Sequence, residues 1–367
     1  DLAARDEFLL AGYVTGQETL YRRVKQLQAG EFLFVSQSQR TLEVRTVRYF
    51  CMKHHEPSHP IETGLYDLLR AHTASIFDRL IKYANGREIV VPLSGGADSR
   101  LIISKLKQLR YPNIKAYTYG SAGNQDAAVS RKVAESLGVD WLYIEYDGEM
   151  LRGNWNAAEA TLFRRIASNC TSLPHVQDWA AVRTLIQTGR IQLNSVIVPG
   201  HCCVTGLIPL HVFKMRKATA DELLDDIWSQ HFSNAPVGCV GKEAVSRIRN
   251  KVHRLLEPGE LLSAHDYAAL ITQFNWQERQ SKYITNSVRA YECLGLDWWL
   301  PLWDRVFVDY WVSTPLVLKK GRVWYKRFVD DVYNEAFSVG RGSDRSEQAH
   351  SCDPCATNSV ARYREWL

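Results

Sequence analysis

One short stretch of the chain combines the residue types that proteins use to hold phosphate groups: Pro92-Leu93-Ser94-Gly95-Gly96-Ala97-Asp98-Ser99-Arg100. Two adjacent glycines let the backbone approach an anion, and the Ser94 and Ser99 hydroxyls can bind phosphate oxygens beside the free N–H groups of a helix start. Asp98 would repel phosphates unless a cation lay between them, so we interpret it as a Mg²⁺ ligand. The spacing matches neither the Walker loop nor the GxGxxG motif. The alternative, a glycine turn capped by Ser and Asp, does not require all of these residues together.

Elements of alternating type surround this loop. The sequence predicts strands at 88–93, 114–119 and 141–146, helices at 101–109 and 127–137, and a fourth strand at 193–198. This order is a βαβαβ unit, so we expect an α/β fold with a parallel sheet flanked by helices. The loop then lies between the carboxyl end of a strand and the next helix, where such sheets bind ligands. Beyond about residue 220 the chain is predicted to be mostly helical.

The N-terminal part has a different character. Residues 9–50 are predicted to form short strands and turns, because the stretches LLAGYVTG and EFLFVSQ are rich in β-forming residues. Two or three strands cannot form an independent core, so this part resembles the end of a larger β-rich unit. We therefore expect three regions: a β-rich fragment (1–55), a nucleotide-binding domain with a helical C-terminal half (56–337), and a small polar tail (338–367).

The stretch SGGADSR (94–100) resembles the pyrophosphate-binding SGGxDS loop of the asparagine synthetase family, whose members are glutamine-dependent amidotransferases with a synthetase domain of the ATP-pyrophosphatase type. Further stretches resemble the family's motifs in the same order: AYTYG followed by Asp126, NSVIVPG (194–200), GLDWWLPLWD (295–304), and 321–328 with Lys326 at the family's Lys position. Residues 15–34 look like the last part of the family's glutaminase domain. The resemblance implies an adenine nucleotide alpha-hydrolase-like fold, with 1–55 as a glutaminase-like fragment.

The resemblance also implies a reaction and its cofactors, ATP and Mg²⁺. ATP adenylates a small carboxylate, pyrophosphate leaves, and ammonia displaces AMP to form an amide. The implied nucleotide-binding residues are Leu93, Ser94, Gly95, Gly96, Asp98 and Ser99 at the loop, with Tyr119, Pro199 and Gly200 near the adenine. Asp98 and Asp126 are the implied metal ligands. The alternative for Asp126 is a helix N-cap.

The chain departs from the family's pattern in two places. Where the family carries acidic residues after the fourth strand, this chain has His201, and no carboxylate follows it in the loop. This Gly-His arrangement is similar to that of surface-polysaccharide amidotransferases of the family, so the acceptor is either aspartate or a sugar uronate. His201 is a candidate base toward the amine, because histidine titrates near neutral pH; the alternative is a hydrogen-bonded, buried histidine. The family's late Arg-x-Lys has no clear match, and Arg341 is the nearest candidate cation.

The source of nitrogen is a separate question. The chain has no N-terminal Cys nucleophile, so we expect free ammonia, or ammonia derived from glutamine by upstream residues or by another subunit.

Cys352-x-x-Cys355 with His350 has the spacing of half of a zinc or redox site. The alternative, loop cysteines without a ligand, explains this pattern more simply.

Composition narrows the class of protein. The 367 residues carry 45 Lys and Arg against 40 Asp and Glu, a net charge of +5, which is ordinary for a globular protein. No basic arm is present, so we expect no nucleic-acid partner. Eight scattered cysteines favour reduced thiols and a cytoplasmic location. Two prolines interrupt the uncharged run 195–213, so we expect no membrane span. The composition is compatible with a homo-oligomer.

Two other functions compete with the amide synthetase. A non-catalytic nucleotide-binding or scaffold protein would explain the missing acid after His201 and the missing late Lys, but not the intact SGGADS loop. An ATP-dependent tRNA-modifying enzyme with the same loop ranks third, because it predicts a basic RNA-binding extension.

Overall fold

A five-stranded parallel sheet forms the centre of the computed structural model, which describes residues 1–38, 41–58, 64–236 and 238–340. The strands are β3 (Ile89–Pro92), β4 (Ile114–Gly120), β5 (Asp140–Glu145), β6 (Val196–Ile197) and β9 (Asp297–Trp298). Their order is β5-β4-β3-β6-β9, and every neighbouring pair is parallel. The predicted α/β class is therefore confirmed. The fourth strand is shorter than expected, with two residues paired in the ladder.

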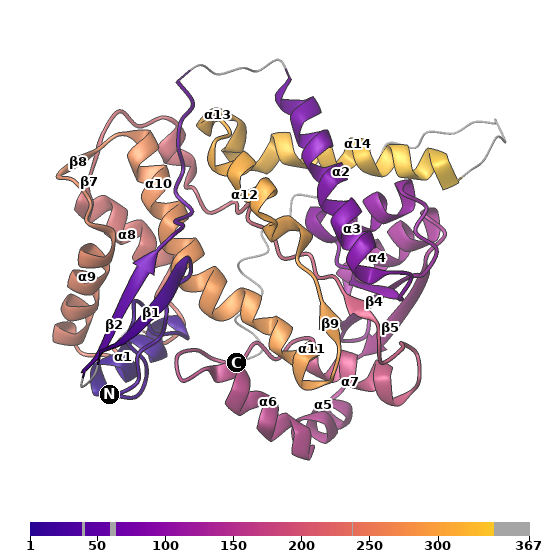
Figure 1. The fold of residues 1–367 in the computed structure, drawn as a ribbon, viewed down its shortest axis with the longest axis horizontal. Coiled ribbons are helices and arrows are strands. Elements are labelled where there is room, and N and C mark those ends of the chain that lie inside the picture. The colour runs from indigo at the N-terminus through magenta and orange to yellow at the C-terminus, as the bar shows by residue number, and fades with distance from the viewer. Residues whose placement is uncertain (39–40, 59–63, 237, 341–367) are drawn as a thin grey trace.

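Helices cover both faces of the sheet because its strands are apolar on both sides. Successive residues of a strand point to opposite faces, so Ile89 and Val91 join one core cluster while Val90 joins another. On the first face lie α2 (Leu65–Ala84), α3 (Ala97–Gln108), α12 (Arg305–Val312) and α14 (Val323–Gly340). The other face carries α6 (Ala158–Ser168), α7 (Trp179–Gln187) and α11 (Arg289–Cys293). Beside α3 lies α4 (Gln125–Ser136). In the upper right of Figure 1, α14 runs near α2 and α3.

The C-terminal half is mostly helical, as predicted. It contains α8 (Ala220–His231), α9 (Lys242–Leu256), α10 (Ala264–Phe274) and the π-helical segment η2 (Asn275–Ile284). Capping boxes begin α8 at Thr219 and α10 at Ser263, each with an acid three residues later. The remaining elements are α5 (Gly148–Trp155), α13 (Leu316–Lys319), β7 (Ala218–Thr219), β8 (Leu261–Leu262), η1 (Leu210–Phe213), η3 (Thr285–Val288), η4 (Pro301–Trp303) and η5 (Lys320–Arg322). No described helix is long and apolar enough to cross a bilayer.

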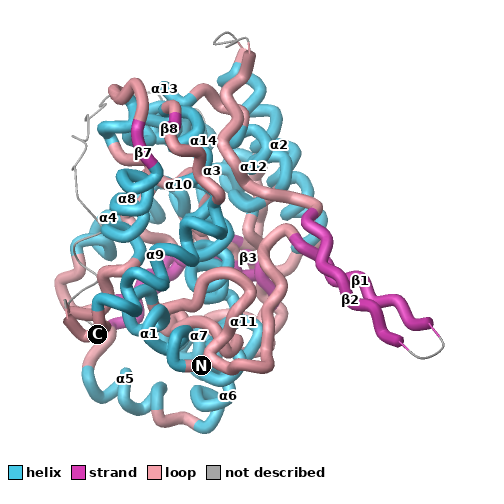
Figure 2. The backbone as a smooth tube through the Cα atoms, turned by 90° about the vertical axis from the view of Figure 1, so that its left-hand side faces the viewer, coloured by secondary structure: helices cyan, strands magenta, loops and turns pink. Residues whose placement is uncertain are grey.

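The N-terminal region is only partly the β structure that the sequence predicts. A helix, α1 (Leu2–Ala11), occupies the place of the expected first strand. The Asp1 side chain caps its start, and Gly12, in a left-handed conformation at φ +79°, ends it. The interior of α1 consists mostly of the helix formers Ala, Leu, Arg and Glu, so it agrees with these end signals. The expected strands do form later, as the hairpin β1 (Glu31–Ser38) and β2 (Thr41–Arg48), which projects from the body in Figure 2.

The first residues share a hydrophobic core with the C-terminal helices. Leu10 and Tyr13 belong to the same cluster as residues of α8, α9 and α10. In Figure 1, α1 lies below this helical group. The N-terminal segment is thus held by packing against residues more than 200 positions away in the sequence.

Candidate functional site

Two loops meet where the direction of strand order changes. From β3 the sheet extends to β4 and β5 on one side and to β6 and β9 on the other, so the loops after β3 and β6 leave a common crevice. Ligands of open α/β sheets bind at such a switch point. A Cβ atom added at Gly200 would lie 2.9 Å from the backbone N of Ser99. The loop after β6 therefore packs directly on the start of α3.

The SGGADS loop is ordered by its own hydroxyls. The Oγ of Ser99 accepts from the backbone N of Ser94 at 3.1 Å and lies 3.1 Å from the Oγ of Ser94. The Oγ of Ser94 also accepts from the backbone N of Gly96 at 3.2 Å. Ser99 is buried, whereas Ser94 and Gly96 are exposed. Ser99 thus holds the loop in shape, while Ser94 and the glycine backbone face solvent.

The start of α3 keeps its backbone donors available. Gly96 is the N-cap residue, and no side chain bonds to the first turn of this helix. The first N–H groups of a helix have no partner within the helix, and their partial positive charge attracts anions. Together with the exposed face of the loop, these donors form a candidate phosphate cradle.

Asp98 has two partners that the sequence did not reveal. Its Oδ1 atom accepts from Nη2 of Arg322 at 2.5 Å and from the hydroxyl of Tyr325 at 2.8 Å. Both partners lie at the start of α14. Burial alone would lower the pKa of the Arg322 guanidinium, but the nearby charge of Asp98 raises it overall. The Asp98 charge is therefore compensated by an arginine in this structure.

Arg322 reaches this position through an uncommon backbone conformation. Gly321 and Arg322 both have φ of +60°, a left-handed conformation that costs energy for a residue with a Cβ. The side chain of Arg322 passes 3.5 Å from the position of a Cβ at Gly206, so it runs along the loop after β6. The resemblance in residues 321–328 places Lys326 at the family's Lys position. In the structure Lys326 lies exposed on α14, whereas Arg322 contacts the loop.

Asp126 lies beside the loop without capping its helix. Asn124 is the N-cap of α4 instead, and its Oδ1 accepts from the backbone N of Asp126 at 2.8 Å. The Oδ1 of Asp126 lies 3.0 Å from the position that a Cβ at Gly95 would take. Carboxylate oxygens are the ligands that Mg²⁺ prefers. Asp126 fits such an ion next to the phosphate cradle, whereas Asp98 fits one only in exchange for Arg322.

His201 has an environment that opposes the base role. Burial is the main cause that lowers the pKa of His201, to about 3, with a smaller contribution from His175. Its Nε2 lies 3.2 Å from Oγ of Ser287, and its Nδ1 is buried without a partner among the described residues. A base is most effective when its pKa lies near the working pH. A ring with this pKa is neutral at pH 7 and can accept a hydrogen bond, but it binds a proton only weakly.

The other predicted site residues are placed as follows. Leu93 and Pro199 are buried at the ends of β3 and β6. Tyr119 lies near the end of β4 and stacks on Tyr146, with 5.0 Å between the ring centroids. All three thus lie at the carboxyl edge of the sheet. Arg341 lies outside the described residues.

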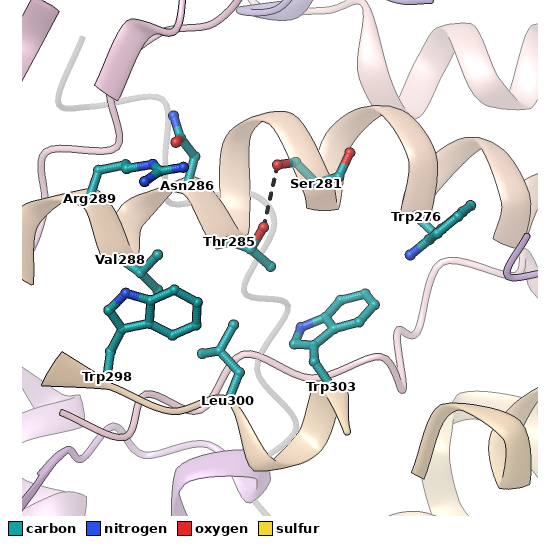
Figure 3. A pocket seen from close by; sticks show the side chains of 9 residues that line it. All are labelled: Trp276, Ser281, Thr285, Asn286, Val288, Arg289, Trp298, Leu300 and Trp303. Atoms are coloured by element: carbon teal, nitrogen blue, oxygen red, sulfur yellow. Dashed lines mark hydrogen bonds between the residues drawn. The ribbon is translucent and has the colours of Figure 1, made fainter. Parts of the chain in front are cut away.

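A cavity of about 310 Å³ lies between the helical residues 276–289 and the segment 298–303. In Figure 3, Trp298, Leu300 and Trp303 on one segment face the helical segment that carries Trp276, Thr285 and Arg289. The remaining lining residues are Ser281, Asn286 and Val288. Ser287, which contacts His201, belongs to the same helical segment. The helical segment that lines the cavity is therefore linked to the nucleotide loop by two contacts, Ser287 with His201 and the neighbouring Gly200 with Ser99.

One stretch of the chain matches a known protein family. Residues 82–160, which include β3, the SGGADS loop, β4 and β5, match the asparagine synthase family. This match confirms the resemblance inferred from the loop. The matched segment covers 79 of the 367 residues. No curated protein matched the sequence.

Solved structures with a similar arrangement include two NAD synthetases. The NH3-dependent NAD synthetase from Campylobacter jejuni is 14% identical, with a TM-score of 0.29, over 58% of this chain and 93% of that one. The glutamine-dependent NAD(+) synthetase from Cytophaga hutchinsonii is 10% identical, with a TM-score of 0.29, over 80% and 58%. The U34-tRNA thiolase NcsA from Methanococcus maripaludis is 11% identical, with a TM-score of 0.25, over 82% and 88%. At these identities and scores, none of them bears on the function of this chain.

Proposed function

We propose that the protein is an ATP-dependent amide synthetase that activates a small carboxylate as its acyl-adenylate and transfers ammonia to it. The observation that carries this proposal is the SGGADS loop at the switch point of the sheet, within the segment that matches the asparagine synthase family. A carboxylate oxygen attacks the α-phosphorus of ATP, and pyrophosphate leaves. Ammonia then attacks the carbonyl carbon, and AMP leaves as the amide forms.

The loop and Arg322 have separate tasks in this reaction. The backbone N–H groups at Gly95, Gly96 and the start of α3 would hold the departing pyrophosphate. Arg322, already held at Asp98, supplies a positive charge at the same loop. Asp126 would hold Mg²⁺, with Asp98 as a second ligand once Arg322 moves off its carboxylate, and the ion would supply positive charge to the phosphates. Backbone groups near Tyr119 and Pro199-Gly200 are proposed to hold the adenine.

The cavity beside His201 is the proposed site of the acceptor. Trp276, Trp298 and Trp303 offer apolar faces suited to a sugar ring, and Arg289 offers a cation for a carboxylate. Arg289 forms an ion pair with Glu292 in this structure, so the acceptor carboxylate would exchange with that side chain. Three tryptophans favour a sugar uronate over aspartate. His201, neutral at pH 7, would orient the reacting groups by hydrogen bonding.

The remaining features of the proposal concern nitrogen supply and setting. Ammonia enters either free or from glutamine, and residues 1–55 are proposed to be the end of a glutaminase-like domain. Residues 56–337 would form the synthetase domain, followed by the tail 338–367. A cytoplasmic location and a homo-oligomer are compatible with this role.

Pyrophosphate release from ATP tests the proposal directly. The protein is incubated with Mg²⁺, ammonia and one carboxylate at a time, including aspartate and a series of sugar uronates, and pyrophosphate, AMP and the amide are measured. Turnover with one acid, in equal amounts of the three products, is the expected result. ATP binding without turnover on any acid would instead support the non-catalytic nucleotide-binding protein, which the Asp98–Arg322 pair favours because it occupies a predicted metal ligand.

A further inference from the structure

Far from the nucleotide loop, three side chains from separate segments converge on one point. They are His54 in the irregular segment after the β1–β2 hairpin, Glu56 two residues later, and His265 in the first turn of α10. The His54 Nε2 lies 3.0 Å from Oε2 of Glu56, and the His265 Nδ1 lies 3.3 Å from the same oxygen. All three candidate ligand atoms lie within 4.8 Å of one another.

These separations match the edges of a zinc coordination shell. Zn²⁺ binds His nitrogen and carboxylate oxygen at about 2.0–2.2 Å in a tetrahedron, which places neighbouring ligand atoms roughly 3.3–3.5 Å apart. Two of the three edges are already 3.0 and 3.3 Å. His265 is half-exposed, so its side chain can rotate to complete the third edge. Two imidazoles and one carboxylate are a borderline ligand set that suits Zn²⁺ better than Mg²⁺ or Ca²⁺.

The Nδ1 atom of His54 faces two groups, which correspond to two tautomers of the buried ring. It lies 3.1 Å from the carbonyl oxygen of Val312 and 2.7 Å from the Nζ of Lys319. When Lys319 is an ammonium, Nδ1 accepts from it and Nε2–H donates to Glu56. Burial lowers the pKa of Lys319 to about 7. Metal binding requires the other tautomer, in which Nδ1–H donates to the Val312 carbonyl and Nε2 is free to bind the ion.

One oxygen of the Glu56 carboxylate has several nitrogen partners at once. Oε2 of Glu56 also accepts from the backbone N of Leu316, at 2.9 Å, so this one oxygen has three nitrogen partners. A cation shared by the two rings and the carboxylate would replace the two imidazole contacts. We propose that His54, Glu56 and His265 form a binding site for a divalent transition metal of the Zn²⁺ type, with a fourth position open to solvent.

This site would join three parts of the fold that are distant in sequence. It links the segment after the hairpin to α10 and, through Leu316, to α13. Binding to the folded state alone stabilises that state. The thermal midpoint should therefore rise by a few degrees with saturating Zn²⁺.

The test uses the full chain with Cys352→Ser and Cys355→Ser, so that the C-terminal cysteine pair does not bind the metal. Metal-free protein is titrated with Zn²⁺ in competition with a chromophoric chelator, and with Co²⁺ while the visible spectrum is recorded. The expected result is one site with a tetrahedral Co²⁺ spectrum and no thiolate charge-transfer band. His265→Ala and Glu56→Gln should each weaken binding by at least about 10-fold, since even outer-shell changes cost that much.

The control is His253→Ala, at an exposed position of α9 outside the cluster, which should leave the affinity unchanged. Melting curves without metal check that each variant is folded. His265 is exposed, so its variant is expected to fold. The proposal is overturned if His265→Ala and Glu56→Gln bind Zn²⁺ as tightly as the parent, if no site is found, or if the Co²⁺ spectrum shows thiolate ligands only.

Discussion

The guanidinium of Arg322 lies on the carboxylate of Asp98, with 2.5 Å between Nη2 and Oδ1. This pair joins the start of α14 to the start of α3, although the two residues are 224 positions apart. The loop that follows β6 runs alongside, because Gly206 lies next to the Arg322 side chain. The Arg322–Asp98 ion pair thus lies where the start of α3, the start of α14 and the loop after β6 meet.

Arg322→Gln should therefore reduce ATP-dependent pyrophosphate release. Loss of one group that stabilises developing charge typically costs about 10²–10³ in kcat. The matched control is Arg327→Gln, an exposed position on α14 shortly after Arg322, which should keep parental activity. Steady-state pyrophosphate release measures the effect, with a melting curve for each variant. Parental activity in Arg322→Gln would exclude a role for this cation in the reaction.

Gly200→Ala should disturb the crevice because the added Cβ would lie 2.9 Å from the backbone N of Ser99 and 3.3 Å from its Cα. Backbone atoms cannot rotate away, so the expected cost is about 1–3 kcal/mol of stability together with weaker ATP binding. Gly153→Ala, within α5, meets no atom within 4 Å and should be neutral or stabilising by up to about 1 kcal/mol. Denaturant unfolding and nucleotide titration measure both variants. Equal behaviour of the two would contradict the close packing of the loops.

Acid should destabilise the fold through its buried histidines. Burial lowers the pKa of His201 to about 3, whereas an unfolded histidine titrates near 6.5. Between these values the unfolded state binds more protons, so stability falls as the pH decreases from 6.5 towards 3, by up to about 1.4 kcal/mol per pH unit for this group. The slope should be shallower in His201→Asn. Unfolding free energies across this range measure it, with His253→Asn on the exposed face of α9 as the control.

Arg289→Gln should impair the acceptor rather than the nucleotide. A charge-assisted hydrogen bond to a carboxylate contributes about 1.5–3 kcal/mol, so the KM for the acceptor should rise roughly 10- to 100-fold. The KM for ATP should not change, because the cavity is separated from the loop by Ser287 and His201. Arg254→Gln, exposed on α9, is the matched control. A rise in the KM for ATP alone would place the acceptor elsewhere.

Lys282→Met should strongly destabilise the protein. The Nζ of this buried residue donates to the carbonyls of Val14 and Gly16 and to Oε2 of Glu278. Removal of one partner of a buried ion pair costs about 3–5 kcal/mol, because the other charge is left uncompensated. Lys242→Met, at an exposed position, should change stability by less than about 0.5 kcal/mol. Chemical unfolding measures the free energy of unfolding of both variants. The double variant Lys282→Met/Glu278→Gln should regain part of the lost stability, because the uncompensated charge of Glu278 is then removed as well.

Local patterns were sufficient for the loop and for four strands of the sheet, but not for β9 (Asp297–Trp298), which was not predicted. The strand at Ile89–Pro92 is a short apolar run, and its parallel neighbours alternate with helices at regular spacing, so chain order alone predicts the βαβαβ unit. Helix boundaries were less accurate: α3 begins at Ala97 rather than at 101, because Gly96 is its N-cap. The helix α1 was missed because a strand was predicted from the stretch LLAGYVTG (9–16), whose first three residues belong to the end of this helix.

The sequence by itself determined the chemistry of the phosphate loop, since glycines, hydroxyls and a carboxylate lie within nine consecutive residues. Only the tertiary structure decided which partners those residues have. Asp98 meets Arg322 because α14 packs on α3, and His201 has a low pKa because the chain around it excludes water. Likewise, His54, Glu56 and His265 meet only after α10 packs beside the segment that follows the hairpin. Charge compensation and desolvation depend on distances through space, which residue order does not contain.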